Sequence, residues 1–263
     1  MNEKKNLALL CDYGLDDLIA TLYLFEHADG FGRIDILPVA GNFPLAQAFV
    51  NAKRVVTYTD VLPEKVRIVD TSSVPQKGEC IPEIHGRDGM GDVLPPEYEE
   101  KVPVVGYEEW LGEVDGSYVI LSLGPCAVTA DILRKKGALP LIMMAGNIAE
   151  PPNYNGREFN HGVDVAAFAQ TVKYPHVSAT LDTCHSPKCD LNRIEVPTEG
   201  ILGRMLCRYR EMSRERKEAV CSVYDLTAVI YLLFPERFAV EQRTDPDGNL
   251  VSVLRYIAEA PIL

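Results

Sequence analysis

Three carboxylates follow directly after the first apolar run of the chain. Asp12, Asp16 and Asp17 lie within six residues, between the apolar run 7–10 and a second apolar stretch, 18–24. Like charges this close repel one another unless a cation lies among them, and Ca²⁺ and Mg²⁺ prefer carboxylate and carbonyl oxygens. The spacing therefore predicts a divalent metal site. Alternatively, Asp16 and Asp17 only favour a helix N-terminus, while Asp12 caps that helix.

A fourth acid lies in an otherwise apolar stretch. Asp225 is flanked by apolar residues within the helix-like segment 219–234. Burying a carboxylate is costly unless it is paired or bound to a metal. We therefore interpret Asp225 as a functional residue.

Apolar runs and helix-like segments alternate along the chain, and they must position these side chains. We predict strands over 7–10, 33–40, 66–70, 117–122, 140–145 and 177–182, and helices over 18–24, 44–59, 125–136, 198–216 and 219–234. A hairpin over 238–263, with Asp247-Gly248 in its turn, ends the chain. This pattern indicates an α/β fold: a single domain over 1–263 with a mostly parallel central sheet flanked by helices. Sites in such folds lie beyond the carboxyl ends of strands.

Two polar loops are long enough to carry function. Segment 71–105 is rich in Gly, Pro and charge, and it contains His85 among glycines and acids, which is typical of a shaped lid or of a plain flexible loop. The segment 146–160 holds four asparagines, whose side chains both donate to and accept from hydroxyl-rich ligands. Asp164 is expected to cap the helix that follows.

Composition excludes several classes of partner. The net charge of −12 argues against nucleic acid and anionic membranes. No apolar run approaches the length of a signal peptide or a membrane helix. The seven scattered cysteines are an odd number, which favours a reduced cytoplasmic protein. The stretch 184–189 holds two cysteines and His185, but it lacks a second ligand pair at zinc spacing.

Six separated stretches, in order, resemble the inosine–uridine preferring nucleoside hydrolases. The family's opening Asp-x-Asp-x-Gly-x-Asp-Asp turn is matched by 10–17, except that Leu10 replaces the first Asp. The other matches are Gly41-Asn42, the His-Gly-x-Asp-Gly-x-Gly loop 85–91, Gly124-Pro125, Glu158-Phe159-Asn160 with Asp164, and the helix segment 224–228 with Asp225. The resemblance covers residues 6 to about 230.

The resemblance implies Ca²⁺-dependent hydrolysis of the N-glycosidic bond of ribonucleosides by a homo-oligomer, a dimer or tetramer. It implies that the metal is held by Asp12, Asp17, Asp225 and the backbone carbonyl of Leu123. It assigns the ribose to Asp16, Asn42, Asn153, Glu158 and Asn160, and it places His85 near the base. Asn153 aligns one residue away from the family's spacing.

The residue types suit that chemistry. Ribosyl cleavage passes through an oxocarbenium-like state, which carboxylates stabilise, while a divalent ion activates water and Asp12 takes its proton. We therefore predict that Asp12, Asp17 and Asp225 converge on one ion.

The chain departs from the family at two positions, Leu10 and Tyr224. Leu10 removes an acid that supports the neighbouring ligands, and Tyr224 stands where many members carry a histidine that protonates the leaving base. A tyrosine ring can stack on the base, which predicts a preference for purines, or its hydroxyl can act as the proton donor.

The alternative function is a catalytically weak protein that binds nucleosides or related ribosides. The opening stretch also loosely resembles enzymes that split S-adenosylmethionine, but the later motifs do not support that reading.

Overall fold

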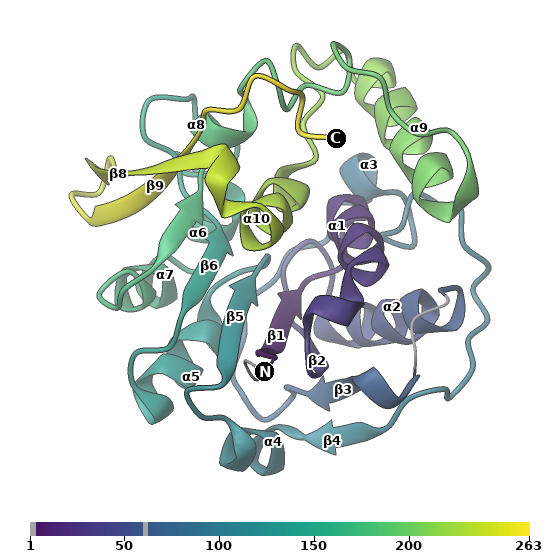
Figure 1. Ribbon diagram of the computed structural model, residues 1–263, viewed down its shortest axis with the longest axis vertical. Coiled ribbons are helices and arrows are strands. Elements are labelled where there is room, and N and C mark those ends of the chain that lie inside the picture. The colour runs from purple at the N-terminus through teal and green to yellow at the C-terminus, as the bar shows by residue number, and fades with distance from the viewer. Residues whose placement is uncertain (1–3, 60–62) are drawn as a thin grey trace.

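The computed structural model describes residues 4–59 and 63–263, which form one α/β unit around a nine-stranded sheet (Figure 1). The strand order is β4-β3-β2-β1-β5-β6-β7-β9-β8, and every neighbouring pair is parallel except β8 with β9. The strands are β1 Asn6–Cys11, β2 Ile34–Pro38, β3 Val66–Asp70, β4 Val104–Gly106, β5 Tyr118–Ser122, β6 Leu141–Met144, β7 Val177–Ala179, β8 Phe238–Thr244 and β9 Leu250–Tyr256. The predicted fold class is confirmed, including the antiparallel C-terminal hairpin.

Helices cover both faces of the sheet. They are α1 Leu15–Glu26, α2 Leu45–Thr57, α3 Pro82–His85, α4 Tyr107–Glu113, α5 Ala127–Lys136, α6 Phe159–Val163, α7 Val165–Thr171, α8 Leu181–Cys184, α9 Gly200–Glu215 and α10 Tyr224–Leu233, with short 3-10 turns η1 Ala28–Gly30, η2 Pro63–Lys65 and η3 Pro235–Arg237. In the core, α1, α2, α9 and α10 pack on one face, while α4, α5 and α7 pack on the other. No helix within 4–59 and 63–263 has the length and apolar character needed to cross a bilayer.

The central strand β1 shows why the sequence forms this layered core. Leu7, Leu9 and Cys11 pack with α1 and α10, whereas Ala8 and Leu10 pack on the opposite face. This alternation is the period-two pattern of a strand that is buried on both sides. Leu10 is therefore a core residue in this protein, and its carbonyl accepts the amide of Leu123, the residue after β5, at 2.8 Å.

The strand order reverses at β1. Strands β2, β3 and β4 extend to one side, and the chain then returns to place β5 on the other side of β1. Loops that leave β1 and β5 must diverge at this point, which opens a crevice at the carboxyl edge of the sheet. The acids after β1 lie at that crevice.

Several elements differ from the sequence prediction. The predicted loop 71–105 contains helix α3 and ends in β4, and helix α4 follows it. The predicted strand 177–182 stops at Ala179, because Thr180 is the N-cap of helix α8, which begins at Leu181. Helix α10 begins only at Tyr224, five residues later than predicted.

The C-terminal hairpin is part of the main sheet, because β9 pairs with β7. Its turn reaches back to the loop before α6: Arg157 donates to both carboxylate oxygens of Asp247, at 2.6 and 2.9 Å. His161 Nε2 lies 3.0 Å from Asp247, and its ring stacks on Phe168. The hairpin therefore fixes the segment that carries Glu158 and Asn160.

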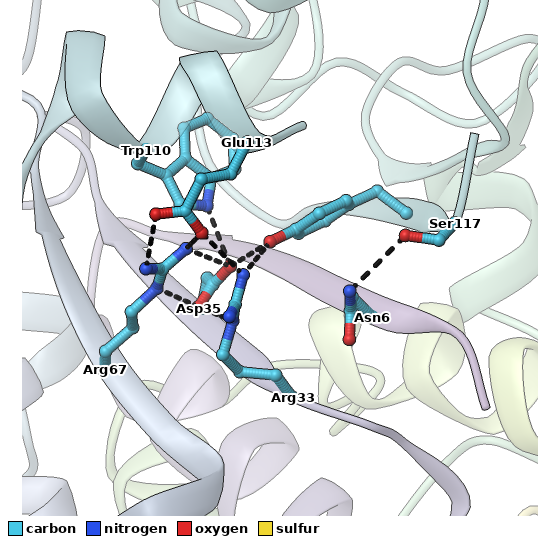
Figure 2. Close-up of polar contacts among 8 residues, drawn as sticks. Asn6, Arg33, Asp35, Arg67, Trp110, Glu113 and Ser117 are labelled. Atoms are coloured by element: carbon cyan, nitrogen blue, oxygen red, sulfur yellow. Dashed lines mark hydrogen bonds and ion pairs between the residues drawn. The ribbon is translucent and has the colours of Figure 1, made fainter. Parts of the chain in front are cut away.

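A buried polar network occupies the amino-terminal edge of the sheet (Figure 2). Asp35 in β2 accepts from the Trp110 indole at 2.8 Å and the Tyr118 hydroxyl at 2.7 Å. Arg33 and Arg67 lie 3.0 and 2.7 Å from the same carboxylate. The most buried charge of this edge is thus fully paired, unlike the acids at the opposite edge.

Candidate active site

Asp12 is held by the loop that follows the neighbouring strand. Its two oxygens accept the Asn42 backbone amide at 2.7 Å and the Asn42 side-chain amide at 2.9 Å. Gly41 allows this approach, because a Cβ at that position would lie 1.8 Å from Asp12 Oδ2. The Gly-Asn pair after β2 therefore orients the first carboxylate, which is fully buried.

Three further acids lie together near Asp12, at the beginnings of two helices. Asp16 and Asp17 lie in the first turn of α1, and Asp225 lies in the first turn of α10. Each offers a carboxylate oxygen, and these oxygens all lie within 4.8 Å of one another. Asp17 Oδ2 accepts the Gly14 amide at 2.9 Å, whereas Asp17 Oδ1 and Asp16 Oδ1 are buried and have no hydrogen-bond partner within the described residues.

The negative charges of these acids repel one another. Burial, followed by the neighbouring carboxylates, raises the pKa of Asp17 and of Asp225 well above the usual range. Burial also raises the pKa of Asp12, while Asp17 and the Asn42 amide act in the opposite direction. Within 4–59 and 63–263, no lysine or arginine forms an ion pair with this group. Buried carboxylates with bare oxygens and no positive partner fit a hard divalent cation.

The gathered set differs slightly from the predicted ligands. Asp17 and Asp225 come together as expected, and Asp16, which the resemblance assigned to the ribose, joins them. Asp12 lies close enough for its charge to raise the pKa of both Asp17 and Asp225. The metal role of each residue stays a prediction.

Helix α6 supplies the opposite wall. Glu158 caps this helix, and its carboxylate accepts the backbone amides of Gly146, Asn160 and His161 at 2.8, 2.8 and 3.0 Å. Burial nevertheless raises the pKa of Glu158 to about 7. Three of its acceptor positions are occupied, so at most one remains for a ligand hydroxyl.

Asn160 presents a bare acceptor. Its amide nitrogen donates to the carbonyls of Leu123 and Met144 at 2.8 and 2.9 Å. Its Oδ1 is buried without a partner. A buried amide oxygen is costly to leave unpaired, so this atom suits a ligand hydroxyl. The Leu123 carbonyl keeps a second lone pair for a further contact.

His85 is fixed at the end of α3. Its Nδ1 accepts the Leu15 amide at 3.1 Å, which leaves the ring proton on Nε2. Nδ1 also lies 3.5 Å from Asp16 Oδ1, but without a proton it cannot donate to that carboxylate. The following loop is anchored by Arg54, a fully buried side chain that donates to Asp88 Oδ2 at 2.7 Å and to the Leu94 carbonyl at 2.6 Å.

Nine of the eleven predicted site residues line one cavity of about 400 Å³, a size typical of small-molecule sites, while Asp12 and Asp17 are not among the residues that line it. Asp16, Asn42, His85, Leu123, Asn153, Glu158, Asn160, Tyr224 and Asp225 all face it. Asn153 lies at its exposed rim. The sequence did not indicate the rest of the wall, which is largely apolar or aromatic: Ile81, Ile84, Tyr154, Phe159 and Tyr209, with Arg216 and Glu218 beside them.

Tyr224 has a partner that the sequence did not predict. Its hydroxyl lies 3.2 Å from His185 Nε2, and His185 Nδ1 lies 2.7 Å from Glu150 Oε2. Burial, with nearby acidic groups, raises the pKa of Tyr224 above its usual range, so the phenol is protonated at neutral pH. The only sequence signal for His185 was its place in the cysteine-containing stretch 184–189.

Known proteins resemble this chain both in sequence, through a family model, and in three-dimensional structure. A family model described as "Inosine-uridine preferring nucleoside hydrolase" matches residues 7–253. The structure resembles a purine-preferring ribonucleoside hydrolase from Gardnerella vaginalis, with a TM-score of 0.71 and 19% identity over 97% of this chain and 93% of that one. It also resembles an inosine-uridine preferring nucleoside hydrolase from Bacillus anthracis, with a TM-score of 0.67 and 14% identity over 96% and 94%. No curated protein matches the sequence.

Proposed function

The chain belongs to the inosine-uridine preferring nucleoside hydrolase family, a family of N-glycosyl hydrolases, and on that premise we propose that it cleaves ribonucleosides to ribose and free base in a Ca²⁺-dependent reaction. One observation carries the proposal. Unpaired buried carboxylates at the reversal of strand order face a cavity whose other wall is aromatic. Such a cavity accommodates a polar sugar at one end and a flat base at the other.

The acidic end would hold the metal. Asp12, Asp17, Asp225 and the Leu123 carbonyl are the proposed ligands, and Asp16 lies beside them. When bound, a divalent ion would supply Lewis-acid activation of water and would offset the repulsion among the acids.

The protein's own residues would bind the sugar and move the proton. Asp12 is the proposed general base, and the Asn42 amide that holds it fixes its orientation. Asn160 Oδ1 would accept a ribose hydroxyl, with Asp16, Asn42, Asn153 and Glu158 as the other sugar contacts. As the glycosidic bond breaks, positive charge develops on the ribosyl ring, and the surrounding carboxylates stabilise it.

The base would lie against the aromatic wall. His85 and Tyr224 border this region, and Tyr154 and Phe159 offer rings for stacking. A purine presents a larger flat surface than a pyrimidine, so we propose a preference for purine ribosides, which implies a place in purine salvage.

A nucleoside panel tests the proposal. We expect ribose release from inosine, guanosine and adenosine to exceed release from uridine, to stop after chelation and to return with Ca²⁺. Asp12→Asn should lower kcat by about 10²–10⁴-fold, since an amide cannot accept the water's proton. Asp115→Asn, in a turn before β5, is the control and should leave kcat unchanged.

Two outcomes would contradict the proposal. Ribose release that chelation leaves intact would remove the metal from the reaction. Nucleoside binding without any ribose release would support the alternative function, a riboside-binding protein of the same fold.

We also propose that the protein is a cytoplasmic homo-oligomer, a dimer or tetramer. The seven cysteines are all free in the structure, which suits a reducing compartment. Light scattering after size-exclusion chromatography measures the oligomeric state directly.

A further inference from the structure

A chain of three polar side chains leads from the surface to the cavity wall. Glu150 Oε2 lies 2.7 Å from His185 Nδ1, and His185 Nε2 lies 3.2 Å from the Tyr224 hydroxyl. Tyr224 lines the cavity, and His185 lies behind it, outside the lining. The hydroxyl of Tyr224 is therefore connected to a group that can carry a proton.

The hydrogen-bond directions are fixed by Glu150. A carboxylate only accepts, so His185 carries a proton on Nδ1. Its Nε2 then accepts from the tyrosine in the neutral ring, or donates to the tyrosine oxygen in the protonated ring. A carboxylate that orients an imidazole in this way is a common arrangement in proton-transfer sites.

Helix α8 holds the chain in place. Asp182, in this helix, accepts the backbone amides of Ile148, Ala149 and Glu150 at 2.7, 2.8 and 3.0 Å. His185 follows the last residue of the same helix, and its amide donates to the Leu181 carbonyl. One short helix thus positions both Glu150 and His185.

The start of α10 is joined to that helix. Ser222 Oγ donates to the Cys184 carbonyl at 2.5 Å, and Cys184 Sγ lies 3.6 Å from the Tyr224 carbonyl. Tyr224 and His185 therefore belong to one rigid arrangement, with ring centroids 5.8 Å apart. Preorganised donors of this kind are effective in catalysis because they need no rearrangement during the reaction.

We propose that Glu150, His185 and Tyr224 form a proton relay that protonates the departing base, an inference that rests on the proposed ribonucleoside hydrolysis. The C1′–N bond breaks and its electron pair passes to the base, while the Tyr224 O–H proton moves to a base nitrogen. His185 starts in the doubly protonated form, its Nε2 proton replaces the lost proton on the tyrosine oxygen, and the neutral ring then takes a proton from the solvent at Nε2. Tyr224 is the catalytic residue, and His185 and Glu150 are positioning residues that act through it.

The relay also defines the substrate class. A purine offers N7, a ring nitrogen with a free lone pair, whereas uracil offers only carbonyl oxygens as acceptors outside its N–H groups. The relay therefore favours purine ribosides for a reason that is independent of stacking.

Two substrates separate the relay from a structural role. Inosine needs a proton on its leaving base, whereas p-nitrophenyl β-D-ribofuranoside releases p-nitrophenolate, a stable anion that needs none. We expect His185→Gln and Tyr224→Phe to lower kcat on inosine by about 10²-fold, the lower range of general acid catalysis. Their kcat on the p-nitrophenyl riboside should stay within about twofold of wild type. Glu150→Gln should show the same selectivity with a smaller loss.

The control is His27→Gln, which replaces a half-buried histidine at the far end of α1 and should leave both rates unchanged. Activity on the p-nitrophenyl riboside also reports that each variant is folded. Equal losses on both substrates, or a Tyr224→Phe variant that hydrolyses inosine at the wild-type rate, would overturn the relay while the proposed function stands. A wild-type protein that hydrolyses neither riboside would overturn the proposed function, and the relay with it.

Discussion

Gly41 lies where any side chain would displace a site residue. Its Cβ would be 1.8 Å from Asp12 Oδ2 and 2.6 Å from the Pro125 ring. Both neighbours are fixed, since Asp12 is buried and held by Asn42, and Pro125 follows β5. An added methyl group must therefore move the carboxylate.

Gly41→Ala should lower kcat/KM for inosine by at least about tenfold, because it displaces the proposed base by a fraction of an ångström or more. The cost in unfolding free energy should be about 1–3 kcal/mol, as for other overpacked sites. Gly112→Ala is the matched control: that glycine occupies an exposed position in helix α4 with nothing near its added Cβ, and alanine should stabilise the helix slightly. A Gly41→Ala variant with normal steady-state rates would place the base elsewhere.

Individual site residues could be predicted from the sequence where they closely follow a predicted strand. Asp12 and Asn42 follow apolar runs, and parallel strands bring their carboxyl ends to one edge. His185 and Glu150 were not predictable, because their contact depends on where α8 lies relative to the loop after β6. No local pattern encodes that placement.

At the scale of elements, the Asp35 network joins β2, β3, α4 and β5 at the amino-terminal edge (Figure 2). Asp35→Asn keeps the shape of the side chain but leaves Arg33 and Arg67 to share Glu113. We expect it to lower the free energy of unfolding by about 3 kcal/mol or more, as for other broken buried ion pairs. Denaturant titration measures this loss.

The control is Glu241→Gln in the exposed strand β8, where Glu241 pairs with Arg243 and Arg255 at the surface. An exposed pair should cost no more than about 1 kcal/mol. The kcat of folded Asp35→Asn protein should equal that of wild type, because the site lies at the other edge. Equal destabilisation by the two substitutions would show that the network contributes little.

Elements with strong apolar patterns were predicted well, and short ones were not. Strand β3 was predicted at its observed bounds, Val66–Asp70. Strand β4 has only three residues, of which Val104 is exposed, so it lacks the apolar run of an interior strand. The apolar run 177–182 spans β7 and the start of α8, because burial alone does not distinguish a strand from a buried helix.

For the whole molecule, the buried acids make stability depend on pH in a direction that is unusual for carboxylates. The folded pKa of Glu158 is about 7, above its ordinary value of 4.5, so the folded state binds this proton more tightly than the unfolded state. The stability that the protonated Glu158 contributes is fully present below about pH 4.5 and is lost as the pH rises through about 7. Asp12, Asp17 and Asp225 act in the same direction.

Between about pH 6.5 and about pH 8, Glu158 alone should remove about 1 kcal/mol of stability from the chelated protein. Burial lowers the pKa of His161 and His176, so these two residues make the protein more stable as the pH rises. Their contribution changes only below about pH 6.5, outside this range. Chemical denaturation at both pH values, with chelator and then with Ca²⁺, tests this. Ca²⁺ should stabilise the protein more at the higher pH, because it favours ionised ligands. A chelated protein that becomes more stable as the pH rises would contradict the shifts.

The contact between Arg157 and Asp247 means that the candidate site needs the C-terminal part of the chain. Asp16 and Asp17 are synthesised early, but Asp225 and the turn that fixes Arg157 belong to the last part of the chain, and the Arg157–Asp247 pair joins residues 90 apart. Strand β9 lies between β7 and β8, so the sheet is complete only when this last strand has been made. During synthesis on the ribosome, a nascent chain that lacks these parts would therefore carry an incomplete set of the proposed metal ligands, and the segment with the proposed sugar-binding residues Glu158 and Asn160 would lack its contact with the hairpin. The proposed ribonucleoside hydrolysis therefore requires Asp225 and the C-terminal hairpin to be made first, so we expect a chain that lacks them to release no ribose from nucleosides.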